Sequence, residues 1–278
     1  MSLLELADGV GTLSPALAKR LAEQTRNAEQ EMRLHERKAN TTGPASYAHW
    51  WQGMGHSAQR TEEVALLRRI VTSSAHAHGP MDTVCEVGMN AGHSATTLLH
   101  GLQTRLIEFD LMALPYSNAT VRLLEARYPG RIHVFPGRSQ LSIPQYAAHQ
   151  RLRLGLPLCD LWFIDGDHEN GAILDMRAAL NVSRDGAIII ADDCSRKHPR
   201  VQLAWRSLID DGHIHESWNR SVGLKGWCVG RFHANQARRA DFNQNFAHAS
   251  TLKLDSISQK CLTRMEQQGN CIRKKAPS

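Results

Sequence analysis

Several features that assign a chain to a common class are missing from this sequence of 278 residues. It has no run of about 18 apolar residues, so we expect neither a membrane span nor a membrane partner. Its N-terminus has no basic region followed by an apolar core, so we expect no secretory signal and a cytoplasmic protein. No internal repeat is visible.

Paired C-x-x-C cysteines are also missing, although the chain has six cysteines. Cys85, Cys159 and Cys228 lie in apolar, strand-like runs, where a free thiol acts as a small hydrophobic side chain. We therefore expect free thiols and a reducing compartment. The sequence does not decide whether Cys261 and Cys271 form a disulfide.

The chain has no basic stripe interleaved with aromatic residues, which a nucleic-acid-binding surface would show. Its formal net charge is +6. The basic residues are scattered and usually stand beside acids or histidines, as on a mixed, solvated surface. We expect no nucleic-acid partner, and keep an RNA-modifying protein as an alternative.

From residue 82 onward, short apolar runs alternate with helical segments. This alternation predicts an α/β fold: a Rossmann-like, doubly wound, mostly parallel seven-stranded sheet with helices on both faces. The last two strands follow each other without a helix, which predicts an antiparallel pair. The predicted strands are 83–88, 106–111, 131–137, 158–166, 186–193, 213–219 and 226–232. The predicted helices are 93–102, 118–128, 171–182 and 198–212.

Three regions are expected along the chain: a helical N-terminal extension over 1–80, a core domain over 81–232 and a C-terminal extension over 233–278. Thr61 begins a T-E-E-V stretch that resembles a capping box and predicts a helix to about Val71. An aromatic group in the extension has two interpretations, a lid over a pocket or packing against the sheet. It consists of Tyr47, Trp50 and Trp51.

The first predicted strand runs into Gly88 and Gly92, spaced G-x-x-x-G before a helix. Glycines there let the backbone approach a ligand, and the helix start offers free N–H groups. This is not the G-x-G-x-x-G fingerprint, which argues against a nicotinamide dehydrogenase. Asp110 follows the second strand about twenty residues later, where an acid commonly holds ribose hydroxyls. Glu108 is the second choice for that role.

Acids also follow the later strands: Asp165 after the fourth, and Asp192 and Asp193 after the fifth. Ligands of open α/β sheets bind beyond the carboxyl ends of the strands. One acid there is commonly structural, whereas acids at three successive strand ends indicate a site. Asp167, next to Asp165, is expected to cap the following helix.

Five stretches in this order resemble class I S-adenosylmethionine-dependent methyltransferases: VCEVGMNAGHSATTLL, IEFDL, GRSQLSIP, LWFIDGDHENGAILDMRAAL and GAIIIADDC. They lie within 82–232, a region that covers roughly half of the chain. The closer resemblance is to the small-molecule O-methyltransferases typified by catechol O-methyltransferase, and it extends to the macrolide-sugar O-methyltransferases. The resemblance implies S-adenosylmethionine as cofactor. The residues it implicates in cofactor binding are Glu86, Gly88, Gly92 and Ser94 for the methionine part, Asp110 for the ribose, Ser139 and Gln140 for the adenine, and Asp165.

The resemblance also implies a divalent cation, Mg²⁺, held by Asp165, Asp192 and Asp193. Asp193 stands where the catechol type has Asn, which keeps an oxygen ligand and adds negative charge. His168, three residues after the first metal acid, corresponds to the general base, and Asp165 and His168 are the expected catalytic residues. A histidine titrates near neutral pH, so one beside a cation and a hydroxyl is suited to take its proton.

These observations predict metal-assisted O-methylation of a hydroxyl group on a small molecule. The alternatives are a metal-independent methyltransferase acting on nitrogen or a carboxylate, the RNA-modifying protein above, and a non-catalytic interaction module of the same fold. The sequence does not decide which molecule accepts the methyl group or whether the protein forms a homo-oligomer. Further residues expected near the acceptor are Arg196, Lys197, His198 and Trp218.

Overall fold

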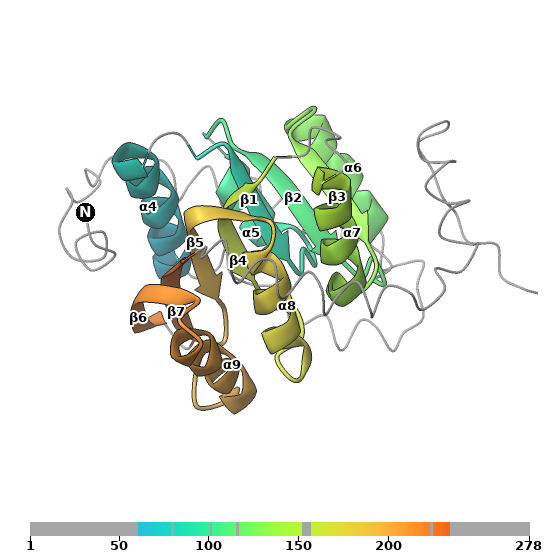
Figure 1. Cartoon of the computed structure of the whole chain (residues 1–278). Helices are drawn as coiled ribbons and strands as arrows, with labels where there is room; N and C mark the ends of the chain where they lie inside the picture. The colour runs from blue at the N-terminus through green and yellow to red at the C-terminus, as the bar shows by residue number, and fades with distance from the viewer. Residues whose placement is uncertain are drawn as a thin grey trace, which may run out of the picture. The chain divides into compact units, whose positions relative to one another are not determined.

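The computed structural model describes residues 61–78, 81–100, 102–114, 117–151, 157–222 and 225–233 (Figure 1). Several predictions lie outside these residues. They are the helical reading of residues 1–60, the aromatic group Tyr47, Trp50 and Trp51, the C-terminal extension beyond residue 233, and the pairing of Cys261 with Cys271.

A seven-stranded sheet forms the centre of the described structure, in the order β3-β2-β1-β4-β5-β7-β6. β1 to β5 run parallel, and β7 lies antiparallel to both β5 and β6. The predicted mostly parallel sheet and the antiparallel pair at its end are confirmed. The strands are β1 (Thr83–Val87), β2 (Arg105–Asp110), β3 (Ile132–Pro136), β4 (Cys159–Ile164), β5 (Ser183–Ala191), β6 (Ile214–Val222) and β7 (Lys225–Phe232).

Six helices accompany the sheet in the described residues. Five of them match the predicted segments, with ends that differ by a few residues. The sixth, α7, was not predicted, because Pro144 lies inside it and proline is rarely found in a helix interior. The helices are α4 (Thr61–His78), α5 (His93–Leu99), α6 (Ser117–Arg127), α7 (Ser139–Arg151), α8 (Gly171–Leu180) and α9 (Pro199–Asp210).

Side chains of the central strands alternate between two apolar clusters, one on each face of the sheet, as the period of two in a strand requires. Trp162 of β4 packs with residues of α7, α8 and α9. Its neighbours Leu161 and Phe163 pack with residues of α4, α5 and α6 on the opposite face. Strands covered on both faces explain the nearly continuous apolar runs in the sequence.

The expectation of free thiols at Cys85, Cys159 and Cys228 is wrong. Cys85 of β1 forms a disulfide with Cys159 of the neighbouring strand β4, and Cys194 forms one with Cys228 of β7. The Cα atoms of these pairs lie 5.8 and 5.5 Å apart, within the usual range for a disulfide. The pairs are 74 and 34 residues apart in sequence, so only the strand order brings them together. Because disulfides are typical of oxidising compartments, the basis for the predicted reducing compartment is removed.

Helix α4 belongs to the predicted N-terminal extension and packs onto the sheet domain. Leu67, Ile70 and Val71 are buried in the same cluster as Leu161. The boundary at residue 80 stays a prediction. None of the helices among the described residues is both long and apolar enough to cross a bilayer.

Candidate functional site

The parallel strands all end at one edge of the sheet, and backbone hydrogen bonds hold these ends in line. The N–H of Asp165, after β4, donates to the carbonyl of Val87 at the end of β1 (2.9 Å). The N–H of Asp192, after β5, donates to Ile164 at the end of β4 (2.9 Å). The predicted site residues therefore emerge side by side from consecutive strands of the sheet.

The glycine loop after β1 passes very close to the end of β4. Gly88 has φ +95°, and a Cβ atom placed there would lie 2.3 Å from the carbonyl oxygen of Asp165. Both observations require glycine at this position. Gly92 has φ +77° and directly precedes α5, in which Ser94 is buried. The predicted cofactor loop is thus packed against the strand end that bears the first predicted metal acid.

The side chain of Asp110 holds this loop at the end of β2 by hydrogen bonds. Its Oδ2 accepts hydrogen bonds from the backbone N–H groups of Met89 (2.9 Å) and Asn90 (3.2 Å), and its Oδ1 accepts one from Met112 (2.6 Å). Asn90 and Met112 both have positive φ, at 49° and 54°. Sequence reasoning predicted Asp110 as a ribose ligand and missed that it shapes the glycine loop.

Two glutamates lie beneath the loop. Glu86 of β1 and Glu108 of β2 are register partners, and both are fully buried. Burial raises the pKa of Glu86 to about 7, although contacts with Glu108 and Ser94 oppose the rise. Burial, and next the charge of Glu86, raise the pKa of Glu108 well above its usual value. Since Glu108 has no exposed surface, the half-buried Asp110 is the acid of β2 that a ligand can reach.

The predicted adenine residues meet a carboxyl group that sequence reasoning missed. Ser139 and Gln140 begin α7, and the Gln140 side-chain amide donates to Oδ1 of Asp175 in α8 (3.0 Å). Asp175 is fully buried, and burial raises its pKa to about 7. The signal for it was a single acid inside the apolar run GAILDMRAAL.

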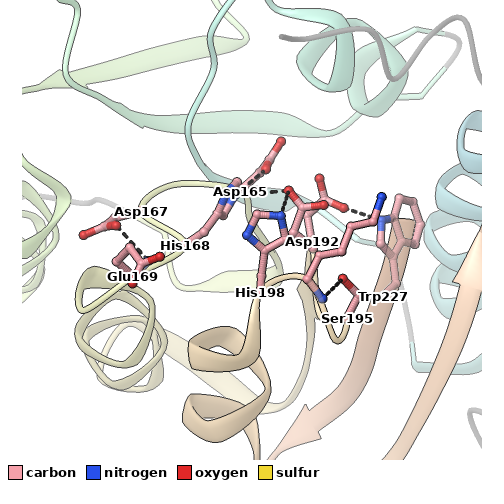
Figure 2. A network of polar contacts seen from close by, with 10 residues as sticks. Asp165, Asp167, His168, Glu169, Asp192, Ser195, His198 and Trp227 are labelled. Carbon is pink, nitrogen blue, oxygen red and sulfur yellow. Dashed lines mark hydrogen bonds and ion pairs between the residues drawn. The ribbon is translucent and has the colours of Figure 1, made fainter. Parts of the chain in front are cut away.

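The structure brings the predicted catalytic and metal residues together. Asp165, Asp192 and Asp193 each offer a carboxylate oxygen, and these oxygens lie within 4.8 Å of one another. His168 Nε2 lies 3.3 Å from Oδ1 of Asp165 and 3.5 Å from Oδ2 of Asp193 (Figure 2). Hydrogen bonding to Asp165 raises the pKa of His168, and burial opposes this rise.

Two details of the acid cluster were invisible in the sequence. Trp227 of β7 donates its indole N–H to Oδ1 of Asp192 (2.7 Å), and both side chains are buried (Figure 2). Asp193 has φ +54°, an uncommon backbone conformation outside glycine that often marks functional positions. Strand β7 thus positions Asp192, and the local backbone conformation positions Asp193.

Asp167 has a structural role, as expected. Its Oδ1 accepts from the N–H of Glu169 and its Oδ2 from the N–H of Gly171, the first residue of α8 (both 2.9 Å). It therefore satisfies the first N–H of this helix from the turn before it, although the N-cap position itself is Asn170, and leaves His168 facing the acid cluster.

The residues expected near the acceptor divide into two groups. His198 directly precedes α9, and its ring lies 5.0 Å from that of His168. Arg196 and Lys197 are exposed in the same loop. Trp218 of β6 instead packs against the apolar cluster on the face covered by α4.

Comparisons with known proteins agree with this architecture. Residues 85–194 match a family model described as a methyltransferase domain. No curated protein matches the sequence significantly. Among solved structures, a putative O-methyltransferase from Klebsiella pneumoniae has 20% identity and a TM-score of 0.50, with 84% of this chain and 95% of that chain covered.

Two further solved structures are similar. An O-methyltransferase from Bacillus cereus, in complex with SAH, has 15% identity and a TM-score of 0.52, with 83% of this chain and 96% of that chain covered. The O-methyltransferase TomG from Streptomyces achromogenes, in complex with SAM, has 18% identity and a TM-score of 0.50, with 61% and 80% covered. Residues 85–194 therefore match a methyltransferase domain, and the described sheet shares the fold of these solved O-methyltransferase structures.

Proposed function

We propose that this protein is an S-adenosylmethionine-dependent methyltransferase and that it transfers a methyl group to a hydroxyl group of a small molecule, with the help of a divalent cation. The observation that carries the proposal is the placement of His168 beside three carboxylates at the edge where β4 and β5 end. The same edge carries the glycine loop after β1. A proton acceptor, a cation-binding donor set and a cofactor loop would thus act on one substrate.

The loop residues fit S-adenosylmethionine, which when bound supplies the methyl group. Gly88, Gly92 and Ser94 would hold its methionine part. Glu86 was also expected there, but it has no exposed surface, so its carboxyl group would favour the ammonium group of the ligand through its charge and not by direct contact.

On the far side of the loop, Asp110 would hold the ribose, and Ser139 and Gln140 the adenine. Because Gln140 donates its amide N–H to Asp175, its carbonyl oxygen is left to accept a hydrogen bond from the adenine amino group.

The donor set fits a hard cation. Asp165, Asp192 and Asp193 offer only oxygen ligands, which Mg²⁺ prefers. Three carboxylates this close repel one another, and a divalent cation would neutralise that repulsion. When bound, the cation would orient the substrate hydroxyl and lower its pKa.

His168 would then take the proton of the hydroxyl. Nε2 of His168 faces Oδ1 of Asp165, so once Nε2 has taken the proton, its N–H would donate to this carboxylate, which stabilises the imidazolium form. With the acceptor and the methyl donor held together, much of the rate enhancement would come from their relative positioning.

The test is calorimetric titration of S-adenosylhomocysteine into the purified protein, first with EDTA and then with Mg²⁺. Binding that is lost in Asp110→Ala supports the cofactor site, and no binding in either condition contradicts the proposal. His168→Ala should leave this binding intact and lower turnover of a hydroxyl substrate by about 100- to 10 000-fold. His215→Ala, in an exposed histidine of β6, is the matched control. Unchanged turnover in His168→Ala removes this histidine as the base, and turnover that is unaffected by EDTA favours the metal-independent alternative.

A further inference from the structure

A second set of ligand-type side chains overlaps the acid cluster. It consists of His168, Asp193 and His198, whose donor atoms lie within 4.8 Å of one another. His168 comes from the loop before α8 and His198 from the loop before α9, so the two histidines converge from separate segments (Figure 2). Their rings meet edge to face, with centroids 5.0 Å apart.

Both imidazoles present Nε2 to the same oxygen. Oδ2 of Asp193 lies 3.5 Å from Nε2 of His168 and 4.0 Å from Nε2 of His198. Two donors that each lie about 2.0–2.1 Å from one ion are about 3.3–4.1 Å apart, from the tetrahedral angle up to a linear arrangement. A separation of 4.0 Å is too long for a direct hydrogen bond. The separations of both histidine nitrogens from the Asp193 oxygen therefore match those of ligands around a shared ion.

The set with two histidines and the set of three carboxylates differ in the metals that their ligand atoms prefer. Imidazole nitrogen suits borderline metals such as zinc, cobalt and nickel, whereas magnesium prefers oxygen. We propose that His168, Asp193 and His198 form a binding site for a divalent transition metal of the zinc type. Three protein ligands leave a coordination position open to water, and all three side chains are partly exposed to solvent.

Binding at this site excludes the role proposed for His168 in methyl transfer. An ion bound to Nε2 occupies the lone pair that would accept the substrate proton, and it also takes Asp193 from the carboxylate set. Zinc should therefore inhibit the enzyme. This consequence rests on the proposed function, whereas binding of the metal does not.

The test uses Co²⁺ as a probe, since its visible absorption reports nitrogen and oxygen ligands directly. Untagged, full-length protein is freed of metal with a chelator and titrated with Co²⁺, and the absorption is then followed as Zn²⁺ displaces it. The variants are His198→Gln, which removes one ligand of the set, and Asp192→Asn, which alters only the carboxylate set. His215→Gln is the matched control, because the ring of His215 also meets that of a second histidine, His233, edge to face, with centroids 5.4 Å apart.

We expect His198→Gln to weaken Co²⁺ binding by about tenfold or more, while Asp192→Asn and His215→Gln keep the wild-type absorption. Wild-type binding in His198→Gln overturns the inference, and so does a loss in Asp192→Asn as large as in His198→Gln. Binding of S-adenosylhomocysteine is measured on the same samples. If it persists where the cobalt result fails, only this inference falls. If it is absent while cobalt binding depends on His198, only the proposed function falls.

Discussion

Replacing Asp175 with Asn should change how the stability of this protein depends on pH. Asp175 is fully buried in α8, and burial raises its pKa from 3.8 to about 7. Asparagine has nearly the same shape, and its carbonyl oxygen still accepts the hydrogen bond from Gln140. The substitution therefore removes the titration and keeps the packing.

The magnitude follows from the two pKa values. Below pH 4 the folded and unfolded chains both carry the Asp175 proton. As the pH rises toward 7, the unfolded chain loses this proton first, so the free energy of unfolding falls by up to about 1.4 kcal/mol per pH unit. Above pH 7 both states are ionised and the loss stops. From pH 5 to pH 8 the wild type should lose about 2–3 kcal/mol through this one group.

The assay is urea denaturation at pH 5 and pH 8, followed by tryptophan fluorescence. Other buried acids, such as Glu86 and Glu108, contribute in the same direction to both proteins, so the wild-type minus variant difference isolates Asp175. Asp175→Asn should already be more stable than the wild type at pH 5, by about 1–2 kcal/mol, and this difference should grow by about 2–3 kcal/mol at pH 8. Asp210→Asn, at an exposed acid of α9, is the control and should follow the wild type. An identical loss from pH 5 to pH 8 in Asp175→Asn and wild type would refute the reasoning.

Three further predictions concern residues and bonds that stabilise the fold around the site. Gly88→Ala should destabilise the protein by about 1–3 kcal/mol in urea denaturation, because φ is +95° and the new Cβ would meet the Asp165 carbonyl oxygen; wild-type stability would contradict this. Trp227→Phe removes the buried hydrogen bond to Asp192 and should cost about 1–3 kcal/mol in the same assay, and a smaller loss would show that this bond is weak. Dithiothreitol should lower the thermal midpoint, because a disulfide typically contributes about 2–4 kcal/mol; an unchanged midpoint would show that neither disulfide stabilises the fold.

Most of the fold could be predicted because its signals are local. Apolar runs of strand length and helix-forming segments between them follow from burial on both faces of a parallel sheet. Helix α7 escaped prediction because Pro144 breaks its pattern, although Ile143 and Tyr146 are buried by tertiary packing. The disulfides escaped because sequence spacing does not give the order of strands.

The candidate site could also be predicted where its signals are local, and not where they depend on contacts between distant elements. Asp165, Asp192 and Asp193 were identified because the carboxyl ends of parallel strands share one edge of the sheet. Asp175 and Trp227 were missed because each acts from an element remote in sequence from the group it contacts. Their roles depend on side-chain contacts between elements, which no local pattern encodes.

The alternation of strands and helices, the glycine loop and the acids that follow the strands can all be recognised in the sequence, since they depend on neighbouring residues and on the geometry common to parallel sheets. Which groups meet depends on the tertiary structure. The tertiary structure places Glu86 beside Glu108 on neighbouring strands and brings His198 to the acid cluster. It also lets Asp110 accept hydrogen bonds from the backbone of the glycine loop. Contacts of this kind arise from strand order and helix packing, and their free energy depends on distances between residues far apart in the chain.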